Sequence, residues 1–104
     1  MSRRPGDLIV KDPNSVEPQG IDWTDFLAEL GSTVVISTST WSVTGPDALL
    51  TLGNDSILTG SLKTKVFLTA GTLGGRYTLT NRIVTNSSPT VTEDASFKVL
   101  IQQK

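Results

Sequence analysis

The chain has 104 residues, the length of one small domain, with 37% hydrophobic and only 18% charged residues, as in a folded chain. The net charge is −1 and the nine basic residues are scattered, which argues against a nucleic-acid-binding surface that neutralises phosphates. The absence of cysteine and histidine excludes disulfides, thiol chemistry and the ordinary serine–histidine and cysteine–histidine nucleophiles. Serine and threonine together make up 26 of the 104 residues, which favours an all-β protein because threonine suits a pleated sheet.

Residues 1–20 are predicted to form an extended N-terminal arm without a core of its own. Three of the five prolines lie here, and each fixes φ and favours extended geometry in the residue before it. The triplet Leu8-Ile9-Val10 is too short for a signal peptide or a membrane span, so we expect no membrane and no export. It is expected to pair at a sheet edge or to dock on a neighbour. The arm residues that are candidates for partner contact are Arg3, Arg4, Leu8, Ile9 and Val10, although a frayed terminus explains the two arginines equally well.

Residues 21–104 are predicted to form the folded domain, beginning with a short helix at about 23–30. Trp23, Phe26 and Leu27 follow the spacing of one helical face. Asp22 is a candidate N-cap, and Gly31 is a candidate residue for the C-terminal end. We expect this helix to close one end of a β-sandwich.

The rest of the chain alternates polar and apolar residues between turn signals, as in an antiparallel sandwich. The apolar parity switches near residues 38–40, which indicates a bulge or a bend between two short strands. The glycine-containing segment 53–55 is predicted to be a turn. The predicted strands cover residues 33–43, 48–52, 56–58, 64–69, 76–85 and 95–101.

Tyr77 makes the prediction more specific, to an Ig-like or fibronectin-III-like sandwich. It follows a glycine-containing loop at the start of a predicted strand, where such sandwiches place a tyrosine that hydrogen-bonds to the backbone upstream. Trp41 is the candidate for the large aromatic residue of the core.

No catalytic or metal site is predicted. The acidic residues lie in the arm, in the helix and in turns, where solvated or capping carboxylates belong. Asn54-Asp55 and Glu93-Asp94 lack the loop spacing of a calcium site, which needs six to eight oxygen ligands. We therefore expect no cofactor and no enzymatic activity.

Several segments together resemble a family of tailed-bacteriophage virion proteins, the fibre–tail adaptors. The resemblance covers about residues 11–86. It implies a non-enzymatic β-sandwich that joins fibres or neighbouring tail components, in a virion assembled in the bacterial cytoplasm. Trp23, Trp41, Tyr77 and Asn81 fit this pattern as fold-defining rather than contact residues. The matching segments are Lys11-Asp12-Pro13, Asp22-Trp23, Ser39-Thr40-Trp41-Ser42-Val43 and the stretch from Gly71 to Thr85.

Three functions are compatible with the sequence. The favoured one is a structural protein of the phage tail or head–tail region, present as a homo-oligomeric ring whose arms contact other virion proteins. The second is a standalone adhesive or carbohydrate-binding module, which needs exposed aromatic residues among the six in the chain. The third, an enzyme, has the least support.

Overall fold

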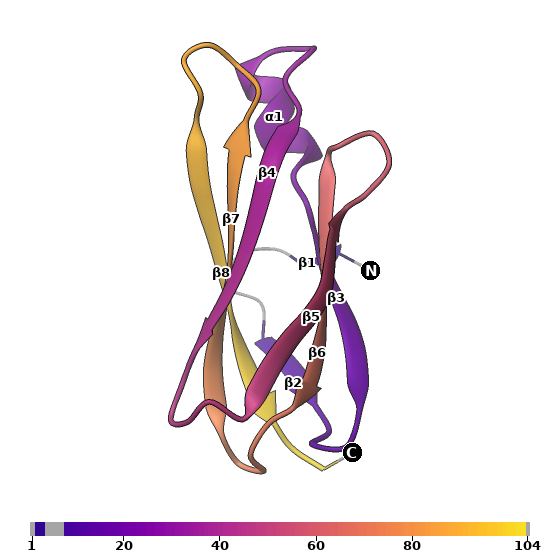
Figure 1. Cartoon of the computed structure of the whole chain (residues 1–104), viewed down its shortest axis with the longest axis vertical. Helices are drawn as coiled ribbons and strands as arrows, with labels where there is room; N and C mark the ends of the chain where they lie inside the picture. The colour runs from indigo at the N-terminus through magenta and orange to yellow at the C-terminus, as the bar shows by residue number, and fades with distance from the viewer. Residues whose placement is uncertain (1, 4–7, 104) are drawn as a thin grey trace.

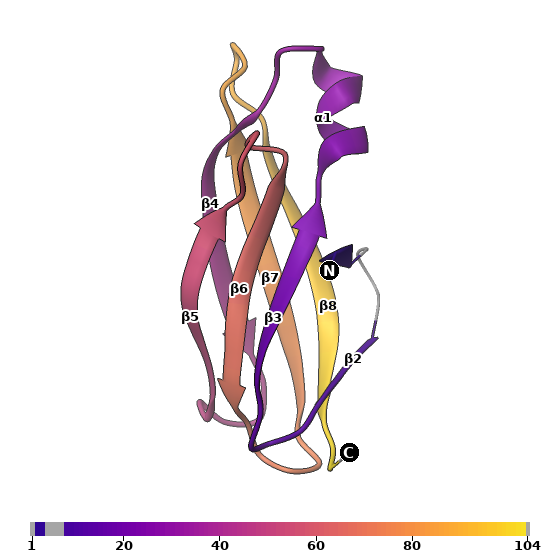
Figure 2. The same cartoon turned by 90° about the vertical axis from the view of Figure 1, so that its right-hand side faces the viewer.

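The computed structural model describes residues 2–3 and 8–103, which form two four-stranded sheets and one short helix (Figure 1). This confirms an all-β protein. The first sheet has the order β1 (Ser2–Arg3), β3 (Val16–Asp22), β6 (Lys63–Ala70), β5 (Leu50–Ile57). The second sheet has the order β2 (Leu8–Lys11), β8 (Thr92–Ile101), β7 (Arg76–Thr85), β4 (Ile36–Thr44). The helix α1 (Thr24–Leu30) lies at one end of the two sheets, as Figure 2 shows.

The chain passes back and forth between the sheets, and the strands β3 to β8 pair antiparallel with one another within each sheet. β5–β6 and β7–β8 are pairs of successive strands, whereas β3–β4, β4–β5 and β6–β7 are connections from one sheet to the other. The N-terminal strands differ, because β2 pairs parallel with β8 and β1 pairs parallel with β3. The molecule is elongated, with extents of 43 × 22 × 20 Å.

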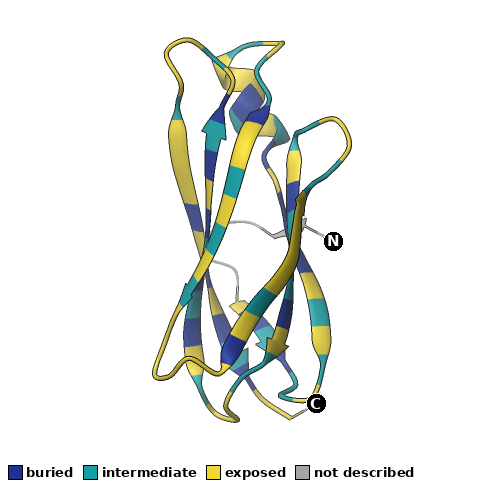
Figure 3. Cartoon of the chain, viewed as in Figure 1, coloured by how far each residue is buried: buried dark blue, intermediate teal, exposed yellow. Residues whose placement is uncertain are grey.

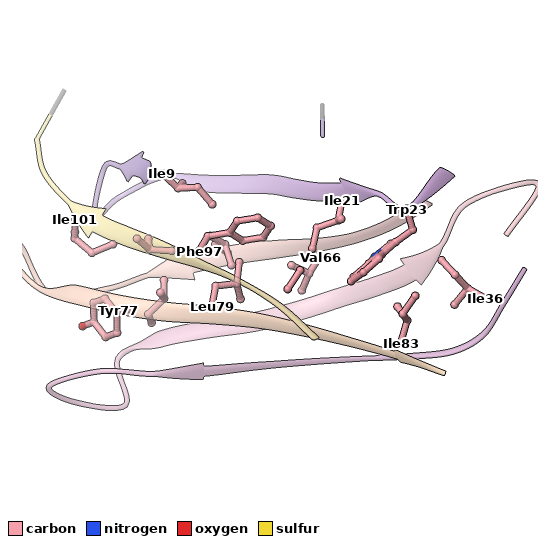
Figure 4. Packing of buried hydrophobic residues seen from close by; sticks show 14 of the residues in the cluster. Ile9, Ile21, Trp23, Ile36, Val66, Tyr77, Leu79, Ile83, Phe97 and Ile101 are labelled. Atoms are coloured by element: carbon pink, nitrogen blue, oxygen red, sulfur yellow. The ribbon is translucent and has the colours of Figure 1, made fainter. Parts of the chain in front are cut away.

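The core lies between the sheets and is filled by alternate residues of the strands, as period-two patterning requires. The central strand β7 has the bounds predicted for it, and every second side chain along it is buried. Figure 4 shows Phe97, Leu79 and Val66 meeting in this layer. The buried hydrophobic residues are Ile9, Ile21, Trp23, Leu27, Ile36, Leu50, Val66, Leu68, Tyr77, Leu79, Ile83, Ala95, Phe97, Val99 and Ile101.

The arm predicted over residues 1–20 needs correction, because its described segments are strands of the sandwich. The side chain of Ile9 is only 1% exposed, and Lys11 is fully buried. Residues 8–11 pair with β8, and β3 pairs with β6 along its whole length. Pro18 is compatible with this because β1 pairs with β3 only at Gly20 and Ile21, so β3 is an edge strand at Pro18.

Two strands contain irregularities, of which only one was predicted. The register of β4 shifts between Ile36 and Thr38, close to the predicted change of parity. The turn predicted at 53–55 is wrong, because β5 continues through this segment with a register shift between Gly53 and Ser56. Asn54 adopts a φ of 50° there, so the glycine and asparagine serve a bulge rather than a chain reversal.

The helix has nearly the predicted bounds, but its N-terminus differs in detail. Trp23 is the N-cap residue and makes no side-chain cap, while Asp22 accepts hydrogen bonds from the hydroxyl and the backbone N–H of Thr24. At the other end, the Gly31 N–H donates to the Leu27 carbonyl over 3.2 Å. Leu27 is the buried residue of α1 and attaches it to the core.

Candidate contact surfaces

Asn81 is the polar centre of the interior and joins four parts of the chain. It is fully buried at the middle of β7. Its Oδ1 accepts hydrogen bonds from Trp23 Nε1 at 3.0 Å and from Thr64 Oγ1 at 2.8 Å. Its Nδ2 donates to Ser39 Oγ at 2.9 Å and to the Thr40 carbonyl at 3.2 Å. One amide thus connects β4, β6 and β7 with the start of α1, and all its hydrogen-bonding capacity is used.

Tyr77 holds the corner between β6 and β7 closed. Its hydroxyl donates to Asp47 Oδ1 at 2.6 Å and accepts the backbone N–H of Thr72 at 3.1 Å. The Thr72 hydroxyl donates to the other oxygen of Asp47 at 2.7 Å. The hydrogen bonds that Asp47 accepts, first from Tyr77 and then from the Thr72 hydroxyl and the Leu49 N–H, hold the pKa of its carboxyl group below the ordinary value. A Cβ at Gly45 would lie 2.3 Å from the ring of Tyr77. The ring therefore leaves no room for a side chain at this position, and only glycine fits.

Lys11 has a structural role that the sequence did not reveal. Its Nζ donates to the carbonyls of Asp12 at 2.8 Å and of Ala70 at 2.7 Å. Ala70 ends β6 with a φ of 66°, so the buried lysine connects the end of β2 in the second sheet to the end of β6 in the first. The only signal in the sequence was its place at the start of the Lys11-Asp12-Pro13 segment.

The residues predicted to contact partners differ in whether they reach the surface. Leu8 is 53% exposed and Val10 is half-buried, but Ile9 belongs to the core and cannot present its side chain to a partner. Arg3 lies in β1, and Arg4 lies outside the described residues. Figure 3 shows how exposed residues alternate with buried ones along the strands.

Leu8 borders a shallow hollow on the outer face of the second sheet. The hollow has a volume of about 210 Å³ and carries two cationic side chains, Arg76 and Lys98. Lys98 Nζ donates to Thr78 Oγ1 at 3.0 Å, which holds the ammonium group against the sheet. The remaining lining comes from Tyr77, Val99 and Leu100.

A second hollow, of about 350 Å³, lies where α1 meets β8 and has the opposite charge. Phe26 stacks edge-on against Trp23, with ring centroids 5.6 Å apart. The pKa of Asp22 is lowered, chiefly by the Thr24 hydroxyl, and that of Asp94 is lowered by its hydrogen bond with Arg82. The hollow is lined by Ile21, Asp22, Trp23, Phe26, Glu93 and Asp94.

A third hollow lies between the edge strands β4 and β5, and Trp41 is part of it. Its volume is about 320 Å³, and it is lined by Ser39, Thr40 and Trp41 of β4, by Leu52, Gly53 and Asp55 of β5, and by Val66. Trp41 is half-buried rather than a central core residue, which corrects its predicted place. Its Nε1 is buried and has no hydrogen-bond partner among the residues that the structure describes.

The described residues include no group of three or more acidic, histidine or cysteine side chains arranged to hold a metal ion. Within the same residues, no helix is long and apolar enough to cross a membrane. A sugar ring binds by stacking on an open aromatic face. Trp23 is only 5% exposed, so its face is not open. The face of Phe67 is occupied by a lysine, since Lys65 Nζ lies 5.3 Å from the centre of the ring. The described residues thus form at least three hollows, which differ in charge and polarity.

A comparison with protein families gives a match over most of the chain. The family described as podophage GP4 fiber-tail adaptor protein gp77 matches residues 11–99, from the end of β2 to near the end of β8. A search of curated protein sequences gives no match. The resemblance suggested by the sequence segments is confirmed by the family match.

Proposed function

The chain belongs to the podophage fiber-tail adaptor family gp77, and we propose that it is a non-enzymatic structural protein that joins fibres to neighbouring tail components. The observation that carries this proposal is the family match over residues 11–99. The interior agrees with a structural role. Trp23, Tyr77 and Asn81 are all buried, and their polar groups make hydrogen bonds inside the domain. Contacts with partners are therefore made by the hollows and the edges of the sandwich.

We further infer that the sandwich is Ig-like. The orders β3-β6-β5 and β2-β8-β7-β4, with successive strands crossing between sheets, agree with the two-sheet arrangement of such domains. The hydrogen bond from the Thr72 N–H to the Tyr77 hydroxyl has the form of a tyrosine corner, in which the tyrosine reaches the backbone a few residues upstream. The parallel β1–β3 pair departs from an all-antiparallel sheet.

In the particle, we propose a homo-oligomeric ring in the tail, assembled in the host cytoplasm and contacting neither nucleic acid nor membrane. A ring requires two different surfaces of one copy to meet, as in any head-to-tail contact. The hollow bearing Arg76 and Lys98 and the hollow bearing Asp22 and Glu93 offer complementary charge for such a contact.

The test is to produce particles in cells where the phage lacks this gene. We expect particles with DNA-filled heads but without fibres, and restoration of fibres when the chain is supplied from a plasmid. Particles that carry their full set of fibres without the chain would refute the adaptor role.

A further inference from the structure

The cationic hollow on the second sheet carries an exposed apolar side chain beside its charges. Leu8 is 53% exposed and lies opposite Lys98 in the β2–β8 pair. The exposed Arg76 side chain makes no hydrogen bond or ion pair with a residue that the structure describes, and Lys98 donates to the Thr78 hydroxyl. Within the described part of the chain, two positive charges without an acidic partner therefore share this surface with an exposed leucine.

The acidic hollow at the junction of α1 and β8 has the complementary composition. Its lining combines three hydrophobic side chains, of which Phe26 is only half-buried, with three carboxylates. Asp94 is engaged by Arg82 over 2.8 Å, whereas Asp22 and Glu93 are exposed and form no ion pair with the residues that the structure describes. This hollow, of about 350 Å³, is thus an apolar recess with two negative charges available to a partner.

The two hollows lie too far apart to satisfy each other within one copy. Lys98 and Glu93 are five positions apart on the extended strand β8, so their backbones are about 16 Å apart and their side chains point to opposite faces of the sheet. β2 pairs with the end of β8 at residues 98–101, and α1 lies at the opposite end of the sheets (Figure 2). A charged partner for either hollow must therefore come from another molecule.

We propose that the cationic hollow of one copy binds the acidic hollow of a second copy of this chain. In this contact Lys98 pairs with Glu93 of the second copy. Arg76 pairs with Asp22 of that copy, and Leu8 packs against its Phe26. The proposal rests on the oligomer proposed above and names the residues that form its contact.

The occupant is a second copy because the chain itself carries both halves of the contact. Each copy presents a cationic half on the outer face of the second sheet and an acidic half beside α1. Because the two halves are different surfaces, the same contact repeats from copy to copy, as a ring requires. Contact between two identical halves would instead bring like charges together, which is unfavourable. Burial of Leu8 against the aromatic ring supplies the apolar part of the contact.

The first experiment reverses the two charges of the Lys98–Glu93 pair, one at a time and together. Each chain is supplied from a plasmid to the phage that lacks the gene, and the amount of the chain in purified particles is measured. We expect Lys98→Glu and Glu93→Lys each to lower incorporation about tenfold or more, because like charges then meet in the contact. The chain with both changes restores opposite charges and is expected to incorporate to within about threefold of wild type.

A matched control makes the same charge change outside both hollows. Glu29 is exposed on α1, and Glu29→Lys alters the charge at the same end of the molecule as Glu93→Lys. We expect this control to incorporate normally. Lys98 and Glu93 are themselves exposed, and thermal unfolding of every variant establishes that it is folded.

The outcomes separate this contact from the adaptor function. If the wild-type chain is absent from particles, the adaptor function fails. If either single reversal incorporates like wild type, or if the folded double variant does not recover, the contact between copies is wrong while the adaptor function stands. If Glu29→Lys is impaired as strongly as Glu93→Lys, the overall charge of the chain decides incorporation, and the proposed contact is again wrong.

A second measurement uses the wild-type chain and does not depend on the folding of a variant. A carbodiimide joins an amine directly to a carboxylate in contact with it, without a spacer. Lys98 and Glu93 of one copy cannot react with each other, because they lie about 16 Å apart along β8 and on opposite faces. We expect a Lys98–Glu93 cross-link in purified particles, and this cross-link must join two copies. Particles in which other lysines of the chain react, but Lys98 is joined only to a different protein or to none, would overturn the proposal.

Discussion

Asn81 shows how one residue can define this fold. Its single amide satisfies Trp23, Thr64, Ser39 and the Thr40 carbonyl, so it orients both sheets and the helix at once. The sequence marked Asn81 only through its place in a family pattern, and Trp23 through that pattern and the spacing of one helical face. Their direct hydrogen bond, between residues 58 positions apart, follows from the packing of the two sheets and is invisible to local periodicity.

Replacing Asn81 should therefore be costly. We expect Asn81→Leu to lower the free energy of unfolding by about 2–4 kcal/mol, because the Trp23 indole and the Thr64 hydroxyl lose their buried acceptor. Urea denaturation measures this. The control Thr80→Val removes an exposed hydroxyl pair with Ser96 and should change stability by at most about 0.5 kcal/mol. A loss for Asn81→Leu no larger than that of the control would contradict the assigned role.

Asp47 should make stability depend on acid pH. Its pKa in the folded chain is lowered by Tyr77, Thr72 and the Leu49 N–H, so the unfolded chain binds more protons in acid. Its stabilising contribution is present above the ordinary value of 3.8 and is lost as the pH falls towards the lowered folded pKa. We expect wild type to exceed Asp47→Asn in urea midpoint near neutral pH, with the difference shrinking in acid.

The same comparison in a Tyr77→Phe background tests the cause. Removing the phenol takes away the largest contribution to the lowered pKa, so the pH dependence of the Asp47→Asn difference should become weaker. An unchanged pH dependence would show that Tyr77 does not hold the Asp47 carboxylate.

At the scale of elements, prediction succeeded where a strand is long and regular. β7 was predicted at 76–85 because its alternation is uninterrupted, and β8 was found from its apolar half. β2 was assigned to an arm because four residues carry no clear period and its parallel partner β8 is distant in sequence. In β5, the glycine and asparagine of a bulge have the same signature as those of a turn.

The N-terminal strands should consequently be required for folding. Deleting residues 1–20 removes β2, including buried Ile9 and Lys11, and most of β3. We expect this variant to show no cooperative thermal transition by circular dichroism. Deleting only residues 1–7 leaves β2 and β3 intact and should preserve the transition. A cooperative transition in the longer deletion would show that residues 1–20 are an arm outside the core, as the sequence suggested.

At the scale of the whole molecule, the family resemblance carried more information about function than composition did. Composition and alternation predicted an all-β domain, and the segments from Lys11 to Thr85 pointed to the adaptor family that the family match confirms. The candidate site was predicted least well. Contact surfaces depend on which edges and hollows the two sheets leave open, and the Trp41 hollow is formed by β4 and β5, which meet only after folding.

The adaptor role is tested most directly by chemical cross-linking of purified wild-type particles followed by mass spectrometry. We expect lysines such as Lys65 and Lys98 of this chain to cross-link to a fibre component and also to a second tail component. Particles that contain no copy of the chain, or in which it cross-links to neither a fibre nor a tail protein, would contradict the account.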